Sequence, residues 1–146
     1  MNQPLSRRAV FLCIERGDTM REILFRGKNP VSSEWAYGSL VLEKNAFDER
    51  LILAIISDAD GNETLVIPET VGQYTGLYDK NGIKVFEGDI ISGKSGRFKV
   101  TWCDSICSFI AAGMDEIHGL PSMNKGTLKY YEIIGNIYDN PELLTR

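Results

Sequence analysis

The chain has 146 residues, which is the size of one domain or of one domain with a short extension. Hydrophobic residues make up 43% and charged residues 25%, ordinary values for a globular protein that argue against wholesale disorder. The net charge of -4 argues against a protein that binds by covering phosphate with positive charge, and no apolar run approaches the roughly 18 residues of a membrane span.

Residues 1–19 differ in composition from the rest of the chain. Their apolar stretch, Ala9–Ile14, is closed by charged residues and is shorter than the roughly 7 to 15 residues of an export-signal core. The segment Glu15–Asp18 can be encoded by a purine-rich ribosome-binding sequence at a suitable spacing before Met20. We therefore expect residues 1–19 to be an N-terminal extension or a mis-assigned start, with Met20 as the natural first residue. A genuine N-terminal helix or arm is the alternative.

Short strands and tight turns are expected throughout residues 20–68. Period-two alternation and apolar or aromatic runs predict four strands, over Arg21–Arg26, Glu34–Glu43, Leu51–Ile56 and Thr64–Ile67. Gly38 marks a bulge or a close approach of two backbones, and Lys44–Arg50 is polar enough for a short helical turn. The apolar run Leu51–Ile56 suits a strand covered on both faces, and Asp58–Asn62 turns the chain back as a hairpin.

The segment Thr70–Tyr78 is rich in Gly, Thr and Tyr. Its two interior glycines disfavour a helix, so we expect an extended segment that crosses between two halves of the fold. The dipeptide Asn81-Gly82 follows between two apolar runs. It supplies the two positive φ angles that a two-residue hairpin turn requires, and it is the clearest local signal in the sequence.

The rest of the chain continues as short strands. These are expected over Ile83–Phe86, Ile90–Ile91, Arg97–Trp102, Cys103–Ala112 and Thr127–Tyr138. A long polar loop over Gly113–Gly126 holds His118. Asn140 is suited to cap a one-turn C-terminal helix that starts at Pro141.

These elements predict a mainly β fold with little helix. Short antiparallel strands would form a small SH3-like or related barrel, with an N-terminal β-hairpin region and a short C-terminal helix. We expect one β domain over residues 20–146, divided into N-terminal strands (20–68) and a barrel-like part (69–146).

The cysteines indicate a reducing compartment. Their number is three, Cys13, Cys103 and Cys107, and an odd count in a chain of this size does not suggest a disulfide framework. Cys103 and Cys107 would share one face of a strand as ordinary buried thiols. A zinc site would need two further ligands, and only His118 is near in sequence.

Six motifs together resemble the YopX family of bacteriophage and prophage proteins. They are Met20–Gly27, Trp35–Gly38, Glu69–Leu77, Asp79–Gly82, Phe86–Ile90 and Ile134–Leu143. The resemblance covers residues 20–146 in the right order and leaves residues 1–19 outside it. It implies a β-rich fold and a phage or prophage setting in the cytoplasm of a bacterial host. It brings no catalytic residues, since the family has no established activity to carry over.

Several polar residues of these motifs have a structural and a functional interpretation. Gln73, Tyr74 and Thr75 either fix the crossing segment by hydrogen bonds or line a binding groove. The others are expected at turns or as a cap, where Gly supplies special φ angles and Asx side chains bond to nearby amides. They are Asn81, Gly82, Gly88, Asp89, Asn136 and Asn140.

One segment places oxygen ligands at the spacing of a calcium loop. Asp58, Asp60, Asn62 and Glu69 stand at positions 1, 3, 5 and 12. Glu63 occupies the sixth position, where such a loop requires Gly, and the flanks suit strands rather than helices. A hairpin turn is therefore expected here, and we expect no metal and no cofactor.

Enzymatic chemistry finds little support in the sequence. No Ser or Cys stands in a nucleophile elbow or triad setting, and no glycine-rich phosphate loop is followed by Lys and a helix. The strand Arg97–Trp102 alternates basic and aromatic residues, but these point to opposite faces, so the aromatics suit the core better than a nucleic-acid surface. We expect a non-enzymatic module that binds a phage or host protein or itself, with a nucleic-acid-binding accessory protein as the alternative and an enzyme third.

Overall fold

The computed structural model describes residues 20–115 and 118–145. The expectations for residues 1–19 concern a segment outside the described residues. The described chain is mainly β, with little helix, as predicted from the sequence. Its elements are β1 (Phe25–Lys28), β2 (Trp35–Lys44), β3 (Ile52–Ser57), β4 (Glu63–Val66), η1 (Pro68–Thr70), β5 (Gly72–Tyr78), β6 (Lys84–Phe86), β7 (Asp89–Gly93), β8 (Gly96–Cys103), β9 (Ser108–Gly113), α2 (Lys125–Leu128), β10 (Glu132–Asn136) and η2 (Pro141–Leu144).

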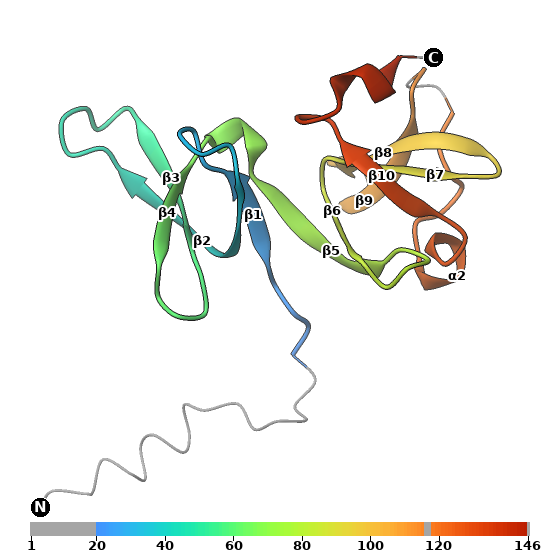
Figure 1. Ribbon diagram of the computed structural model, residues 1–146, viewed down its shortest axis with the longest axis horizontal. Coiled ribbons are helices and arrows are strands. Elements are labelled where there is room, and N and C mark those ends of the chain that lie inside the picture. Colours follow the sequence, from blue (N-terminus) through green and yellow to red (C-terminus); the bar gives the residue numbers. More distant parts are fainter. Residues whose placement is uncertain (1–19, 116–117, 146) are drawn as a thin grey trace, which may run out of the picture.

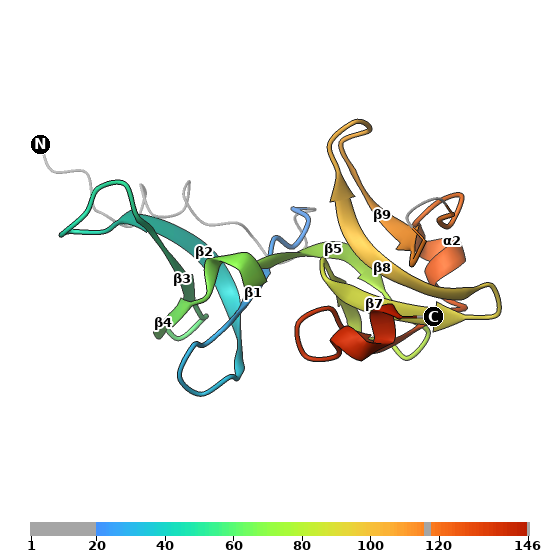
Figure 2. The same ribbon diagram turned by 90° about the horizontal axis from the view of Figure 1, so that it is seen from above.

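The strands form two antiparallel sheets joined by β5. The first sheet has the order β4-β3-β2-β1-β5-β6 and the second has the order β10-β7-β8-β9. Figures 1 and 2 show two parts side by side, with β5 running from the first part, β1–β4, to the second. The start of β5 pairs with β1 through Gly72 and Gln73, and its continuation pairs with β6. The crossing segment predicted for Thr70–Tyr78 is confirmed by this arrangement.

The first part is a strongly curved sheet around a small core. Ala54, Ile56 and Val66 are buried, with four half-buried partners, Phe25, Ala36, Leu40 and Val71. Gly38 lies so close to the Ser57 carbonyl that a Cβ would collide with it, which confirms the predicted close approach.

The predicted barrel is not closed in the described residues. A barrel requires the outermost strands of a sheet to pair. In the part predicted to be barrel-like, residues 69–146, the end strands β10 and β9 of the second sheet do not pair, and in the first part β4 bonds only to β3. The chain after β4 reaches β1 through one backbone hydrogen bond, from Ile67 N to Lys28 O (2.9 Å). Turn spacing and strand count are the same for a curved open sheet and for a barrel, so the sequence pattern does not distinguish them.

The second part packs the β5–β6 hairpin and α2 against the second sheet. Its buried residues are Val85, Ile91, Phe98, Val100, Ala111, Leu128 and Tyr131. Phe98 and Val100 of β8 point into this core, as the alternation over Arg97–Trp102 predicts, but Trp102 near the end of the strand is 43% exposed, so the prediction that it fills the core is wrong. The strand predicted from Thr127 is wrong at its start, because Asn124 accepts a hydrogen bond from Thr127 N and caps the short helix α2. The strand β10 begins only at Glu132.

The local turns differ from expectation at three places. Gly82 has φ +75°, but Asn81 has no positive φ, and Gly82 N bonds to Asp79 O, so the turn has one left-handed residue rather than two. Lys44–Arg50 forms no helical turn: Lys44 ends β2, and residues 45–51 are the loop between β2 and β3. Cys103 ends β8 while Cys107 lies in the following loop with φ +50°, so the two thiols do not share a strand face.

The C-terminal helical turn is confirmed as the 3-10 turn η2, which starts at Pro141, but Asn140 does not cap it: its side chain makes no cap hydrogen bond, and its Oδ1 accepts from Asn136 N instead. The predicted strand Leu51–Ile56 corresponds to β3, but only one of its faces is fully covered. Ala54 and Ile56 on that face are buried, whereas Leu53 and Ile55 on the other face are half-buried. Among the described residues, no helix has the length and apolar character needed to cross a membrane.

Candidate functional site

A buried ion pair joins the two parts of the molecule. Arg26 lies in the middle of β1, and Asp89 is the first residue of β7. An Nη atom of Arg26 lies 2.8 Å from Asp89 Oδ1, and their side chains are only 7% and 3% exposed. The second carboxylate oxygen of Asp89 accepts a hydrogen bond from Phe86 N at 2.7 Å. Both charges are therefore satisfied mainly by protein groups rather than by water.

Aromatic rings surround the Arg26 guanidinium. Its central carbon lies 4.7 Å from the ring centre of Trp35 and 5.0 Å from that of Phe86, which are cation–π distances. The Nε atom of Arg26 is buried and has no hydrogen-bond partner. Burial raises the pKa of the Asp89 carboxyl, and the attraction of Arg26 and the bond from Phe86 N oppose that rise without reversing it.

A second polar contact lies beside the first. Asp139, after β10, forms an ion pair with Lys28 and accepts a hydrogen bond from Trp35 Nε1 at 2.7 Å. Asn136 Nδ2 donates to the same carboxylate at 3.0 Å. These hydrogen bonds from Asn136, Lys28 and Trp35 lower the pKa of Asp139 to about 2. The contact thus favours an ionised Asp139, whereas burial acts against ionisation of Asp89.

Tyr138 completes the junction between the two parts. Its hydroxyl donates to the Glu69 carbonyl at 2.7 Å, and its ring centre lies 5.9 Å from that of Trp35. Burial raises the pKa of the Tyr138 hydroxyl. Gly88 packs against this ring with φ +90°, and a Cβ there would lie 3.1 Å from Tyr138 Cε2. We call Arg26, Lys28, Trp35, Asp89, Tyr138 and Asp139 the junction.

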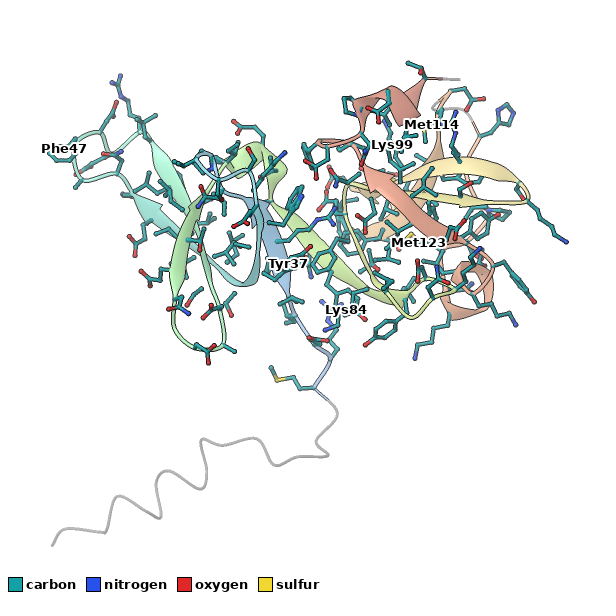
Figure 3. All side chains as sticks on the ribbon, viewed as in Figure 1. Tyr37, Phe47, Lys84, Lys99, Met114 and Met123 are labelled. Atoms are coloured by element: carbon teal, nitrogen blue, oxygen red, sulfur yellow. The ribbon has the colours of Figure 1, made fainter. Side chains whose placement is uncertain are left out.

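A hollow of 520 Å³ opens next to the junction. Its wall is mostly apolar, and Tyr37 and Lys84, which contribute to it, lie between the two parts in Figure 3. Lys84 Nζ is engaged by Glu22 at 2.6 Å and lies 5.4 Å from the Tyr74 ring centre. The carboxylate on this wall, Asp89, is held by Arg26 and by Phe86 N. The hollow therefore suits an apolar group better than it suits proton transfer.

The second notable surface is the β2–β3 arm, which we define as residues 42–52. Figure 3 shows Phe47 at its tip, pointing away from the rest of the molecule. Phe47 is fully exposed (101%), and the other large apolar residues of the arm are at least half exposed. They are Leu42, Leu51 and Ile52. Apolar side chains gathered on a projecting hairpin indicate a surface that another molecule covers.

The crossing residues Gln73, Tyr74 and Thr75 lie in β5, next to the junction rather than on an open surface. Tyr74 is buried, its backbone N bonds to Leu24 O, and burial raises the pKa of its hydroxyl. The Thr75 hydroxyl donates to Val85 O at 2.8 Å, and Gln73 O accepts from Glu87 N. These contacts use the polar groups to hold β5; a groove formed by the three residues stays a prediction.

The predicted turn and cap residues lie at turns. Gly88 follows β6 with positive φ, and Asp89 bonds to the Phe86 amide three residues earlier. Asn136 Oδ1 accepts from Tyr138 N and Asp139 N, and Asn140 Oδ1 accepts from Asn136 N at 3.2 Å. The turn after β10 is thereby held in the shape that brings Asp139 and Tyr138 to the first part.

The calcium-type segment is a hairpin turn. Asp58 Oδ1 accepts from Asp60 N and Asn62 N, and Asp58 Oδ2 accepts from Asn62 Nδ2 at 2.9 Å. These bonds lower the pKa of Asp58. Glu69 lies in η1, beyond the opposite end of β4, so the fold does not bring it to the turn. Across the described ranges, no group of three or more His, Cys, Asp or Glu side chains is placed to hold a metal.

Sequence reasoning missed the residues that make the junction. The period-two alternation over Arg21–Arg26 predicts a half-buried strand with Arg26 on its polar face, yet Arg26 is buried. Asp79 begins the motif Asp79–Gly82, and its contacts reach beyond the turn that Asn81-Gly82 predicts. Its carboxylate accepts from Asn81 N and Ile83 N and, from the distant β10, Ile133 N at 3.0 Å. A polar residue in a strand whose partner is more than fifty positions away leaves no local signal.

Comparison with known proteins identifies a family and similar solved structures. The family described as YopX protein matches residues 24–145. The crystal structure of protein EF1440 from Enterococcus faecalis is similar with a TM-score of 0.53 and 25% sequence identity, over 86% of this chain and 99% of that one. A search of curated proteins gave no match.

Proposed function

We propose that this chain, which belongs to the YopX family, is a non-enzymatic module that binds another protein. Its setting is the cytoplasm of a bacterial host, and its gene is of phage or prophage origin. The partner is a phage or host protein. The chain could instead bind a second copy of itself, because both sheets have open edge strands with unpaired backbone groups.

The observation that carries the proposal is the apolar surface of the β2–β3 arm. Phe47 is fully exposed and Leu42 is 63% exposed, on a hairpin that projects from the fold. Exposing such side chains to water is unfavourable by about 25 cal/mol per Å² relative to covering them. A protein partner that covers the arm gains this free energy on binding. Exposed apolar side chains on a projecting hairpin do not contribute to catalysis in the same way.

The chemistry of the junction supports the same conclusion. Arg26 and Asp89 neutralise each other, and Asp139 is held by Lys28, Trp35 and Asn136. Charged groups whose hydrogen bonds and charges are satisfied by one another hold the two parts of the fold together. They are poorly placed to activate a substrate, which requires a base with a free lone pair or an exposed nucleophile.

The nucleic-acid alternative is favoured by one observation. Trp102 is 43% exposed and its ring centre lies 5.1 Å from that of Phe109, at the far end of the β8–β9 hairpin, where a base could stack. The neighbouring Asp104 accepts a bond from Trp102 Nε1 at 2.8 Å, and that carboxylate would repel a phosphate backbone. We therefore place this function second.

Affinity capture with the tagged full chain tests the proposal. The bait is recovered from cells that make the protein naturally, with and without nuclease treatment, and gel filtration with light scattering gives its own oligomeric state. A protein retained in both samples, or a stable oligomer, is the expected result. A partner lost on nuclease treatment supports the nucleic-acid alternative, and a monomeric bait that retains nothing contradicts both.

A further inference from the structure

We propose that the tip of the β8–β9 hairpin is a site of reversible oxidation, where a hydroperoxide oxidises Cys103 and Cys107 then closes a disulfide with it. We call residues 103–108 the tip loop. Figure 2 shows this hairpin projecting from the second part. Cys103 is half-buried and Cys107 is exposed, so a small dissolved oxidant reaches both. The proposal goes beyond the binding function and does not depend on it.

The hairpin brings the two cysteines close together. Cys103 pairs with Ser108 across the end of the two strands, and residues 104–107 turn the chain between them. Facing Cα atoms in such a pair lie about 4.5 to 5.5 Å apart, and the next residue is about 3.8 Å further along the chain. A step at right angles to the pair therefore puts the Cα atoms of Cys103 and Cys107 about 6 to 7 Å apart. Disulfides accept about 4.4 to 6.8 Å, so closure requires only a small backbone movement.

Both cysteine side chains bond to neighbouring residues of the loop. Cys103 Sγ lies 3.1 Å from Ser105 Oγ, and Cys107 Sγ donates to the Asp104 carbonyl at 3.4 Å. The backbone N of Cys107 bonds to the same carbonyl, also at 3.4 Å. Cys107 has φ +50°, a left-handed conformation in which a glycine would be less strained. The turn accepts this strain and folds the second thiol back towards the end of β8.

The hydrogen bonds of the two thiols differ, and this difference assigns their roles. The Ser105 hydroxyl, followed by the Ile106 amide, bonds to the Cys103 sulfur and lowers the pKa of that thiol. Desolvation and the charge of Asp104 oppose the shift without reversing it. The thiolate is the reactive form, so Cys103 is the sulfur that is oxidised first. Cys107, whose S–H donates to a carbonyl, is the resolving thiol.

The oxidation takes place in two balanced steps. The Cys103 thiolate attacks one oxygen of the hydroperoxide: an S–O bond forms, the O–O bond breaks, and the leaving oxygen takes a proton from solvent. The sulfur of Cys107 then attacks the resulting sulfenic acid, so that an S–S bond forms, the S–O bond breaks and water leaves with the Cys107 proton. Two electrons pass from the thiols to the hydroperoxide. A disulfide at the upper limit of Cα separation is strained and readily reduced, which makes the modification reversible.

Hydrogen peroxide added to the purified full chain tests the proposal. Trypsin, which cleaves after Lys and Arg, releases both loop cysteines in one peptide, residues 100–125, and Cys13 in another, residues 9–16. We expect peroxide to lower the mass of the 100–125 peptide by two hydrogen atoms and dithiothreitol to restore it. The same treatment in urea is the matched control. Unfolding removes the bonds from Ser105 and Ile106, so the disulfide should form more slowly there.

Two variants with one thiol each in the loop test the roles of the cysteines. In Cys107→Ser, peroxide should leave Cys103 as a sulfenic acid that dimedone traps, because the resolving thiol is gone. In Cys103→Ser, the matched control, position 107 should give no dimedone adduct under the same conditions. Urea midpoints close to that of the wild type show that both variants remain folded.

Four results would overturn the proposal. The first is a 100–125 peptide whose mass peroxide leaves unchanged. The second is a disulfide that joins Cys13 or a second chain to the loop in place of the bond within it. The third is equal dimedone labelling of the two variants, which contradicts the assignment of Cys103 as the reactive thiol. The fourth is equal closure in the folded and the unfolded chain, which would show that nearness in sequence, and not the folded loop, makes the bond.

Discussion

Replacing Asp89 with Asn should destabilise the protein by about 3 to 5 kcal/mol at neutral pH. The reason lies in what the substitution leaves behind. Arg26 is 7% exposed, and without the charge of Asp89 its guanidinium has only neutral partners: the new amide, the Glu87 carbonyl at 3.4 Å and the faces of two aromatic rings. Arginine cannot lose its charge in this pH range, so the cost of an uncompensated buried cation falls entirely on stability.

The partner substitution Arg26→Met should cost less. Methionine can fill the space between Trp35 and Phe86 with favourable contacts between sulfur and aromatic rings. The carboxyl left behind can also become neutral. Burial already raises the pKa of Asp89, and removal of Arg26 removes an influence that opposes the rise. A raised folded-state pKa means that stability is greatest below the unfolded pKa and declines as pH rises, so the loss in Arg26→Met should shrink as pH falls.

The double variant, Arg26→Met with Asp89→Asn, should recover most of the loss and lie within about 1 kcal/mol of the wild type. The amide oxygen that the second substitution places at position 89 can still accept the bond from Phe86 N. Urea unfolding of the four proteins at neutral pH, followed by far-UV circular dichroism, gives the coupling energy directly. Losses that simply add in the double variant, or a loss of less than about 1 kcal/mol in Asp89→Asn, would refute a buried pair that depends on both charges.

The junction and the hairpin turns lead to three further expectations. The Asp139 carboxyl, with a pKa of about 2, favours folding above its unfolded pKa of 3.8, and this contribution disappears as pH falls towards 2. Asp139→Ala should therefore cost about 1 kcal/mol at neutral pH, allowing for a side chain one-third exposed, and show a shallower loss of stability in acid titrations of the urea midpoint. Gly88→Ala should lower the melting temperature more than Gly61→Ala. Their φ angles are similar, +90° and +84°, but only Gly88 faces a ring at 3.1 Å, so equal shifts would contradict that packing. Millimolar calcium should leave the melting temperature unchanged, because Asp58 is engaged within its turn; a rise would revive the metal site.

Local elements were largely predictable because their causes are local. The alternation over Arg97–Trp102 places Phe98 and Val100 in the core, and the structure confirms it. Turn residues such as Gly82 and the Pro141 turn also follow from short-range φ preferences. The errors at this level are equally local. Asn124 caps a helix in a stretch where the apolar residues alone suggest a strand.

The junction was not predictable, because the sequence determines which residues share a face but not what covers that face. Arg26 alternates with Phe25 in a way typical of a solvated strand surface. Arg26 is buried because β7, more than sixty positions later in the chain, places Asp89 next to it. The failure to predict that the sheets are open has the same cause. Whether β4 pairs with another strand depends on curvature and register, which turn spacing does not encode.

The junction and the arm differ in exposure, and this difference separates residues that hold the fold together from residues that serve the proposed binding. Two ionised side chains with many contacts, Arg26 and Asp139, lie between the two parts and bond to residues of this same chain. The most exposed apolar side chain of the arm, Phe47, points outward on an ordered loop. Substitutions at the junction should therefore change stability while leaving partner recovery per folded molecule intact, and substitutions on the arm should do the opposite. Junction variants that abolish binding while remaining folded would show that the hollow, and not the arm, is the surface the partner uses.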